Sequence, residues 1–324
     1  MRVTIAEVAR RARVSKATVS RVLNDRGEVD AATAVRVRDV IAATGYTPSA
    51  GAVGLARGRT QTVGVLVPGL TRPWVGDVLQ GVADVLEARG YALLLHTATR
   101  GADSITQFAR QVNANTFDGQ LLLEPPSTDF LRTATTPTVI IDDRAHHPGF
   151  PTVAPDNRAG AELAARHLLA AGRTTPAVIT GPPRLTRTHD RSTGFTDAYH
   201  RAGHPTPHHV EGGLTREAGH AAVTALLAAT TPFDSLFAHD DLTALGALDA
   251  LREARIPVPT AIPVIGFDDT PAAAHTHPAL TTIAHPAREM GETATTLLLR
   301  LLAGDKPPTT PQILPTHLVI RETA

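Results

Sequence analysis

The sequence predicts a small all-α helix-turn-helix domain at the N-terminus, followed by an α/β body of two doubly wound subdomains. Two short helices with a tight connection can be recognised in the first 24 residues. From Val63 onward, short β-branched runs alternate with helical stretches, and the alternation repeats too often for one sheet. With 324 residues, 42% of them hydrophobic, the chain is long enough for a small domain and a large one.

The first helix is expected to begin at Thr4. Thr4 and Glu7 stand three residues apart and form a capping box, in which each side chain can satisfy the other's free backbone N–H. Ile5, Val8 and Ala12 follow with the spacing of one helical face.

A second helix is expected over residues 16–24, with Ser15 as its N-cap. Because only two residues separate the helices, they must cross steeply, and Val19 and Val22 then pack on the first helix. The residues that face outward are Lys16, Ala17, Ser20 and Arg21. This is the geometry of a helix-turn-helix.

A third helix is expected to run from an Asp30 cap to Thr44, with Gly45 in the position of a left-handed terminator. The residues expected to complete a miniature core are Val35, Val40 and Ile41.

Charge is distributed unevenly along a chain whose formal net charge is zero. Up to Thr60 there are eleven Lys and Arg against five acidic residues, and the remainder has twenty against twenty-six, so the head is +6 and the body −6. A basic head suits a polyanion, because phosphate contacts release condensed counterions, although a solvated basic face is also common.

Three segments of the head resemble the lactose-repressor and galactose-repressor family: Val3 to Asn24, the turn Gly45-Tyr46-Thr47-Pro48, and Leu55 to Thr60. Ser15 to Asn24 nearly repeats that family's recognition-helix signature. The resemblance implies that the chain is a transcription regulator that binds double-stranded operator DNA.

The resemblance also implies which residues touch DNA. Lys16, Ala17 and Arg21 would face base edges in the major groove, with Arg21 placed for a bidentate contact to guanine. The residues that would hold phosphates are Thr4, Ser15, Thr18, Ser20 and Asn24. Leu55 would open a minor-groove step from a hinge helix. The alternatives are solvated polar residues on a structural helix and an ordinary apolar linker residue.

Two residues of the head and hinge depart from the family pattern. Arg13 stands where the family usually has glycine, so a positive φ there would cost on the order of 1 kcal/mol. Ser49 replaces a usual asparagine and, with Gly51 and Gly54 in the hinge, favours a helix that forms only on DNA.

The body is expected to contain the following segments. The strands are 63–67, 91–95, 120–123, 139–141, 177–180, 236–238 and 264–267. The helices are 75–89, 157–171, 188–202, 216–229 and 242–255. The resemblance implies the periplasmic-binding-protein type I fold, with crossings between the subdomains near Ala154, Ala284 and Gln312.

Polar residues directly after strands are candidates for a ligand site, because ligands bind beyond the carboxyl ends of parallel strands. These candidates are Asp142, His239, Asp240 and Asp268. The resemblance adds Arg191 and Trp74 and implies a small polar effector, a carbohydrate. As alternatives, Asp240 and Asp268 are helix N-caps, Asp142 and Arg191 form an interdomain ion pair, and Trp74 belongs to the core.

Several other classes of protein fit less well. The strand-end acids lack an accompanying nucleophile motif, phosphate loop or HExxH pattern, so an enzyme is not expected, nor is a cofactor. Histidine pairs such as His146 and His147 lie in polar loops, and no metal is expected. A solute-binding protein would need a secretion signal and no DNA-binding head.

The expected organisation is a helix-turn-helix domain over residues 1–48, a hinge over 49–61, and an effector-binding and dimerisation domain over 62–324. The chain has no cysteine and no apolar run that could cross a bilayer, which favours a cytoplasmic protein with no membrane partner. A homodimer, or a higher oligomer, would read a pseudo-palindromic site. Induction and corepression both fit the sequence.

Overall fold

The computed structural model describes residues 3–23, 29–47, 59–131, 135–142, 150–229, 232–306, 308 and 310–324. The chain divides into two compact units, Met1–Thr60 and Gln61–Ala324. The finer division into a domain over 1–48 and a hinge over 49–61 stays a prediction, because residues 48–58 lie outside the described part.

The first unit contains helices α1 (Ile5–Ala12), α2 (Lys16–Leu23) and α3 (Ala31–Thr44). All three expected N-caps are confirmed: the hydroxyl of Thr4 accepts from the N–H of Glu7, that of Ser15 from Thr18, and the carboxylate of Asp30 from Thr33. The capping box is only half formed. The Glu7 carboxylate accepts from the arginines of the next turn, Arg10 and Arg11, rather than from the N–H of Thr4.

The core of this unit forms where the three helices meet. Its buried side chains are Val8, Ala9, Ala12, Val19, Val22 and Val37. The expectation for Val35 is wrong: its side chain is 53% exposed, and Val37 instead turns inward with none of its surface exposed. Val40 and Ile41 pack against the cluster as expected.

Arg13 closes α1 in the left-handed region, with φ 54° and ψ 45°. Its backbone N–H donates to Arg10 O, and Val14 N–H donates to Ala9 O, so this conformation ends the helix within one turn. The expected positive φ at Arg13 is therefore confirmed.

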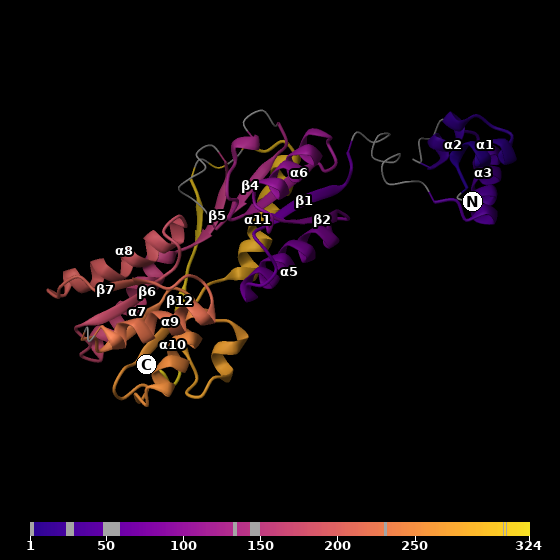
Figure 1. The fold of residues 1–324 in the computed structure, drawn as a ribbon. Helices are drawn as coiled ribbons and strands as arrows, with labels where there is room; N and C mark the ends of the chain where they lie inside the picture. Colours follow the sequence, from indigo (N-terminus) through magenta and orange to yellow (C-terminus); the bar gives the residue numbers. More distant parts are fainter. Residues whose placement is uncertain are drawn as a thin grey trace. The chain divides into compact units, whose positions relative to one another are not determined.

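The second unit contains two six-stranded sheets (Figure 1). The first has the order β11-β5-β4-β3-β1-β2 and is parallel throughout. Its strands are β1 (Thr62–Val67), β2 (Ala92–Thr97), β3 (Gly119–Leu123), β4 (Thr138–Ile141), β5 (Thr152–Pro155) and β11 (Gln312–Leu314). The second has the order β12-β10-β9-β8-β6-β7. Its strands are β6 (Pro176–Thr180), β7 (His208–Glu211), β8 (Ser235–Ala238), β9 (Val264–Asp268), β10 (Thr281–Ala284) and β12 (His317–Val319), which alone runs antiparallel to its neighbour.

Helices accompany each sheet, and each sheet with its helices forms one subdomain. Those of the first subdomain are α5 (Pro73–Ala88), α6 (Ala102–Asn113), α11 (Ala287–Leu302) and the short η1 (Asp129–Leu131). Those of the second are α7 (Asn157–Ala170), α8 (Thr186–Arg201), α9 (Arg216–Ala228), α10 (Asp241–Glu253) and the short η2 (Pro271–His275). Helices α5 and α11 pack against each other closely at a glycine. A Cβ on Gly81 of α5 would come within 2.1 Å of Arg288 O of α11.

The chain crosses between the subdomains three times: after β5, after β10, and between β11 and β12. These crossings confirm the expected positions near Ala154, Ala284 and Gln312, and the expected fold of two doubly wound subdomains is confirmed with them. None of the described helices has the length and apolar character needed to pass through a membrane.

Some elements were not recognised in the sequence. They are α6, α11, η1, η2, β5, β7, β10, β11 and β12. β7 is a four-residue edge strand with mostly exposed polar side chains, and β11 and β12 are three residues long. Such short or edge strands have little hydrophobic pattern of their own, because tertiary pairing rather than local propensity decides them.

Candidate functional site

The exposed face of α2 presents the residues expected to contact DNA. Ser15, Lys16, Ala17 and Arg21 are exposed, whereas Thr18 and Ser20 are half-buried. The opposite face is buried through Val19 and Val22. The helix thus presents a polar, basic surface from a three-helix support with a buried apolar core. Asn24 and Leu55 lie outside the described residues.

Two contacts stabilise this support without using the exposed face of α2. The side chains of Arg10 and Arg11 donate to Glu7, which lowers the pKa of that carboxyl to about 2. Arg36 Nε of α3 donates to Ala12 O at 3.0 Å, which ties the end of α1 to α3. Arg10, Arg11 and Arg36 therefore have partners inside the head.

The body has a cleft at the point where strand order reverses in both sheets. β1 lies between β2 and β3, and β6 lies between β7 and β8, so the connections after these strands diverge and leave a crevice at their carboxyl ends. The polar side chains of the cleft enclose a cavity of about 20 Å³. Its charged and aromatic lining is Arg72, Trp74, Arg187, Arg191, Asp240 and Asp268.

Two larger cavities flank this small one. The first, of about 440 Å³, is bounded by Arg72, Arg187, Glu124 and Asp142. The second, of about 620 Å³, shares Trp74 and Asp268 with the small cavity. Arg72 and Arg187 therefore line both the small cavity and the first of these, and Trp74 lines both the small cavity and the second.

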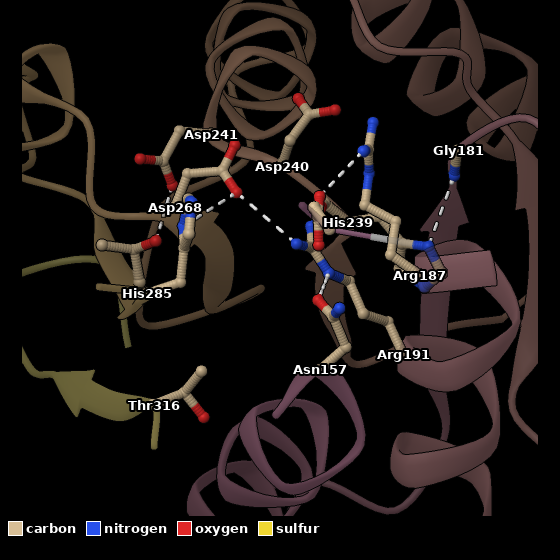
Figure 2. A network of polar contacts seen from close by, with 12 residues as sticks. Asn157, Gly181, Arg187, Arg191, His239, Asp240, Asp241, Asp268, His285 and Thr316 are labelled. Atoms are coloured by element: carbon tan, nitrogen blue, oxygen red, sulfur yellow. Dashed lines mark hydrogen bonds and ion pairs between the residues drawn. The ribbon is translucent and has the colours of Figure 1, made fainter. Parts of the chain in front are cut away.

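Arg191 is the centre of a buried network (Figure 2). Its Nε donates to Asn157 Oδ1 at 2.8 Å, its Nη1 donates to His239 O, and its Nη2 lies 3.6 Å from Asp268 Oδ1. Its guanidinium carbon lies 3.5 Å from the centroid of the Phe267 ring. Burial lowers the pKa of Arg191, while the nearby Asp268 opposes that shift. The network joins α7, α8, β8 and β9 within the second subdomain.

The alternative in which Asp142 pairs with Arg191 is wrong. Asp142 Oδ2 lies 3.2 Å from Nη1 of Arg187, and Arg187 also pairs with Glu124. Arg187 stands one helical turn before Arg191 on α8, which brings it to the first subdomain while Arg191 stays within the second. The ion pair that crosses the cleft is therefore made by Arg187.

Asp240 serves both as a cap and as part of the cavity wall. Its Oδ1 accepts from Thr243 N–H at 2.7 Å, which confirms the N-cap alternative. Its Oδ2 is buried and has no hydrogen-bond partner among the described residues. Asp240 therefore keeps one acceptor oxygen at the cavity.

Asp268 does not cap a helix, so that alternative is wrong. Its carboxylate lies between Arg191 and His285, whose Nδ1 is 3.5 Å away. Burial raises the pKa of Asp268 well above its usual value, and Arg191 opposes this. Burial also shifts the pKa of His239, in this case below its usual value. The Nδ1 of His239 accepts from Gly181 N–H at 3.3 Å. This hydrogen bond ties the end of β8 to the residue that follows β6.

Trp74 belongs to both the core and the cleft. It is 6% exposed and packs in the core of the first subdomain. Its ring meets His285 edge-on at 5.5 Å between centroids, and the guanidinium carbon of Arg187 lies 5.8 Å from the ring centroid. The core alternative for Trp74 is therefore confirmed. The same residue also lines the small cavity, and its contact with an effector stays a prediction.

Four cleft residues were not recognised in the sequence: Arg72, Glu124, Arg187 and His285. Glu124 directly follows β3, so the strand-end rule that selected Asp142 applies to it equally. Arg187 stands four residues before Arg191, the spacing of one helical face. His285 follows β10, a strand that the sequence did not reveal. Within the described residues, no three His, Asp or Glu side chains are grouped in a way that could hold a metal ion.

Comparison with known proteins agrees with both units. Residues 4–49 match "Bacterial regulatory proteins, lacI family", and residues 165–324 match "Periplasmic binding protein-like domain". The chain is 31% identical to the ribose operon repressor of Halalkalibacterium halodurans, over 99% of this chain and 96% of that protein. The chain belongs to the lacI family.

Solved structures of lacI-family proteins have the same fold. The lac repressor dimer bound to operator and an anti-inducer is 25% identical, with a TM-score of 0.87 over 100% of this chain and 99% of that chain. A lacI-family regulator of Enterococcus faecium with bound ribose is 27% identical, with a TM-score of 0.73 over 81% of this chain and 98% of that chain. The prediction of a DNA-binding transcription regulator, rather than an enzyme, is confirmed.

Proposed function

We propose that this lacI-family regulator is a cytoplasmic repressor that binds pseudo-palindromic operator DNA as a homodimer, under the control of a sugar bound in the body cleft. The observation that carries the proposal is that one chain combines an exposed basic face on α2 with a cleft at the switch point of both sheets, where Arg191, Asp240 and Asp268 converge.

The DNA-binding half of the proposal assigns base contacts to Lys16, Ala17 and Arg21. Arg21 donates two hydrogen bonds to one guanine, since its planar guanidinium matches the two acceptors on the major-groove edge of that base. The phosphate contacts come from Thr4, Ser15, Thr18, Ser20 and Asn24, and they set the register of the head on the duplex.

A hinge over residues 49–61 connects each head to its body. Leu55 enters a minor-groove step from this hinge, together with Leu55 of the second protomer. Such a wedge unstacks a base step at a cost of a few kcal/mol, which additional contacts offset when both protomers bind. Symmetric pairing of two heads explains why the operator would be a pseudo-palindrome.

The effector half assigns sugar binding to Trp74, Asp142, Arg191, His239, Asp240 and Asp268. The indole of Trp74 offers an apolar face for a sugar ring, and the carboxylates and Arg191 offer acceptors and donors for its hydroxyls. Two of the comparisons support a sugar: the H. halodurans relative is named a ribose operon repressor, and the E. faecium structure contains ribose. D-Ribose is therefore the first candidate to test.

Control of DNA binding requires that the sugar bind two conformations of the body unequally. A coupling free energy of about 1 to 3 kcal/mol would change operator affinity roughly 5- to 150-fold. The rearrangement of the two subdomains around the cleft would alter how two protomers present their heads.

Selection of the purified full-length protein on random duplex DNA tests the proposal. We expect enrichment of two inverted half-sites whose centres lie about 10 base pairs, or a multiple, apart. Thermal unfolding with D-ribose and other sugars tests the second half, because a ligand of the folded state raises the unfolding temperature. Absence of any enriched DNA, with and without sugars, would contradict the proposal.

A further inference from the structure

The cleft contains a charged side chain where a ligand would be expected. Arg187, in the first turn of α8, is buried, with 6% of its side chain exposed. It points away from its own subdomain to Asp142 and Glu124, which follow β4 and β3 of the other subdomain. The same guanidinium lies beside Trp74, with 5.8 Å between its carbon and the ring centroid.

The cavities next to Arg187 show that its side chain occupies space in which a ligand could bind. The cavity between Trp74 and Asp268 measures about 20 Å³, which is enough for one water molecule. Ligand pockets are usually about 300–1,000 Å³. The neighbouring cavity of about 440 Å³ falls in that range, and Arg187 lines both. Arg187 therefore forms, with Arg72, part of the wall between the two cavities, and it lies beside Trp74.

We propose that Arg187 is an internal occupant of the effector cleft: it joins the two subdomains through Glu124 and Asp142 when no effector is bound, and the effector must displace it. This inference rests on the proposed function and extends it to a residue that sets the affinity and the class of the effector. Arg191, in contrast, is held by partners of its own subdomain and remains in place.

The chemistry of the vacated positions indicates which ligand can displace Arg187. Its departure takes one donor from Asp142 and one from Glu124, although Arg72 still donates to the other oxygen of Glu124, and a buried acceptor atom that loses its donor is costly. A ligand with several hydroxyl groups on an apolar ring supplies donors to Glu124 and Asp142 and a face for Trp74. Burial lowers the pKa of Arg187, and the like charges of Arg72 and Arg191 lower it further, while Asp268 and Asp240 oppose the shift. Burial and like charge both favour release of Arg187 toward solvent.

The first experiment measures the cleft without any ligand. The chain has no cysteine, so spin labels can be placed on Pro126→Cys and Arg184→Cys, exposed positions that line the 440 Å³ cavity from opposite subdomains. Labelled protomers are mixed with an excess of unlabelled protein, so that distances within one protomer dominate. We expect Arg187→Leu and Glu124→Gln each to lengthen and broaden the label distance. Arg158→Leu, which breaks an exposed ion pair between α7 and α8 inside one subdomain, should leave it unchanged.

The second experiment measures D-ribose binding by titration calorimetry on unlabelled protein. If the competent form of the wild-type cleft is populated at about one part in ten, Arg187→Leu should bind about tenfold more tightly, because apparent affinity scales with that fraction. Weaker binding by Arg187→Leu would mean that Arg187 contacts the sugar, and the inference would be overturned. An unchanged label distance in both cleft variants would overturn it as well.

The two experiments separate this inference from the proposed function. If no sugar binds any variant but the label distance lengthens, the cross-cleft ion pair stands and the sugar assignment fails. If D-ribose binds wild type and Arg187→Leu equally and the distance is unchanged, the proposed function stands and the role of Arg187 fails. Arg187→Lys, which keeps the charge but not the planar fork, should give an intermediate distance.

Discussion

Arg191 and Asp268 connect helix α8 to the end of β9 through a buried contact of 3.6 Å between Nη2 and Oδ1. The two side chains belong to one subdomain and line the small cavity together. They form a preorganised pair of donor and acceptor that does not depend on how the two subdomains are arranged. A ligand that enters the cleft meets this pair already in place.

Replacement of Arg191 by Leu should abolish D-ribose binding while operator binding persists. The variant leaves Asp268 buried without its guanidinium partner, so we expect the free energy of unfolding to fall by about 3–5 kcal/mol. Titration calorimetry and denaturant unfolding measure the two effects. Arg201→Leu, on the exposed side of the same helix, is the matched control and should change neither by a comparable amount. Normal ribose binding by the Arg191 variant would remove it from the site.

Replacement of Arg21 by Ala should remove the preference for one base pair in each half-site. Loss of a bidentate contact to guanine costs about 1–3 kcal/mol at that position and little elsewhere. Competition binding with single-base operator variants measures this preference. Arg11→Ala, an exposed arginine paired with Glu7 on α1, should leave the preference intact. Uniform weakening over all sequences would instead make Arg21 a phosphate contact.

Replacement of Arg13 by Gly should stabilise the head. Arg13 holds φ at 54°, a region in which a side chain costs roughly 1–2 kcal/mol and glycine does not. Because glycine also gains freedom in the unfolded chain, the net gain should be about 1 kcal/mol. Slower amide hydrogen exchange in α1 and α2 of the full-length protein would show it. Arg11→Gly, inside α1, should instead make amide hydrogen exchange faster. Faster exchange in both variants would contradict the strain at Arg13.

The stability of the body should depend on pH through Asp241, the first residue of α10. Its buried carboxylate accepts from Thr270 N–H at 2.7 Å and from Thr282 Oγ1 at 2.5 Å, and burial raises its pKa from 3.8 to about 7. Between these two pH values the unfolded chain releases the proton while the folded chain keeps it, so this contribution to stability falls as pH rises from about 4 to 7.

Denaturant unfolding of wild type and Asp241→Asn across this pH range tests that effect. The difference in unfolding free energy, wild type minus variant, should decrease from pH 4 to 7 and then level off. Asp249→Asn is a useful contrast, because hydrogen bonding to Arg216 lowers the pKa of Asp249, and its contribution is lost on acidification instead. Parallel profiles for wild type and Asp241→Asn would show that Asp241 titrates normally.

Local signals in the sequence predicted the head well. The caps at Thr4, Ser15 and Asp30 depend on side chains three residues apart, and all three form. The error at Val35 arose because Val35 and Val37 both fit a short apolar pattern, and the packing of α3 on its neighbours decides which turns inward.

The cleft was predicted only in part, because its residues meet through contacts across the fold. The strand-end rule located Asp142, Asp240 and Asp268 at the cavities, yet it could not assign partners to them. The same rule selected His239, which is buried and lines none of these three cavities. Whether an arginine of α8 reaches its own subdomain or the other depends on the crossing of the chain after β5 and on which turn of the helix faces the cleft. The sequence therefore identified candidate positions at the ends of strands. The structure was needed to show that Arg187, rather than Arg191, forms the ion pair across the cleft.

A sugar in the body cleft is expected to change the affinity of the head for its operator. Fluorescence anisotropy titration of the full-length protein on its selected operator, with and without saturating D-ribose or another sugar found to bind, measures this coupling directly. The account predicts a roughly 5- to 150-fold difference in Kd in wild type and none in Arg191→Leu. Identical operator affinity with and without a sugar that calorimetry shows to be bound would contradict it.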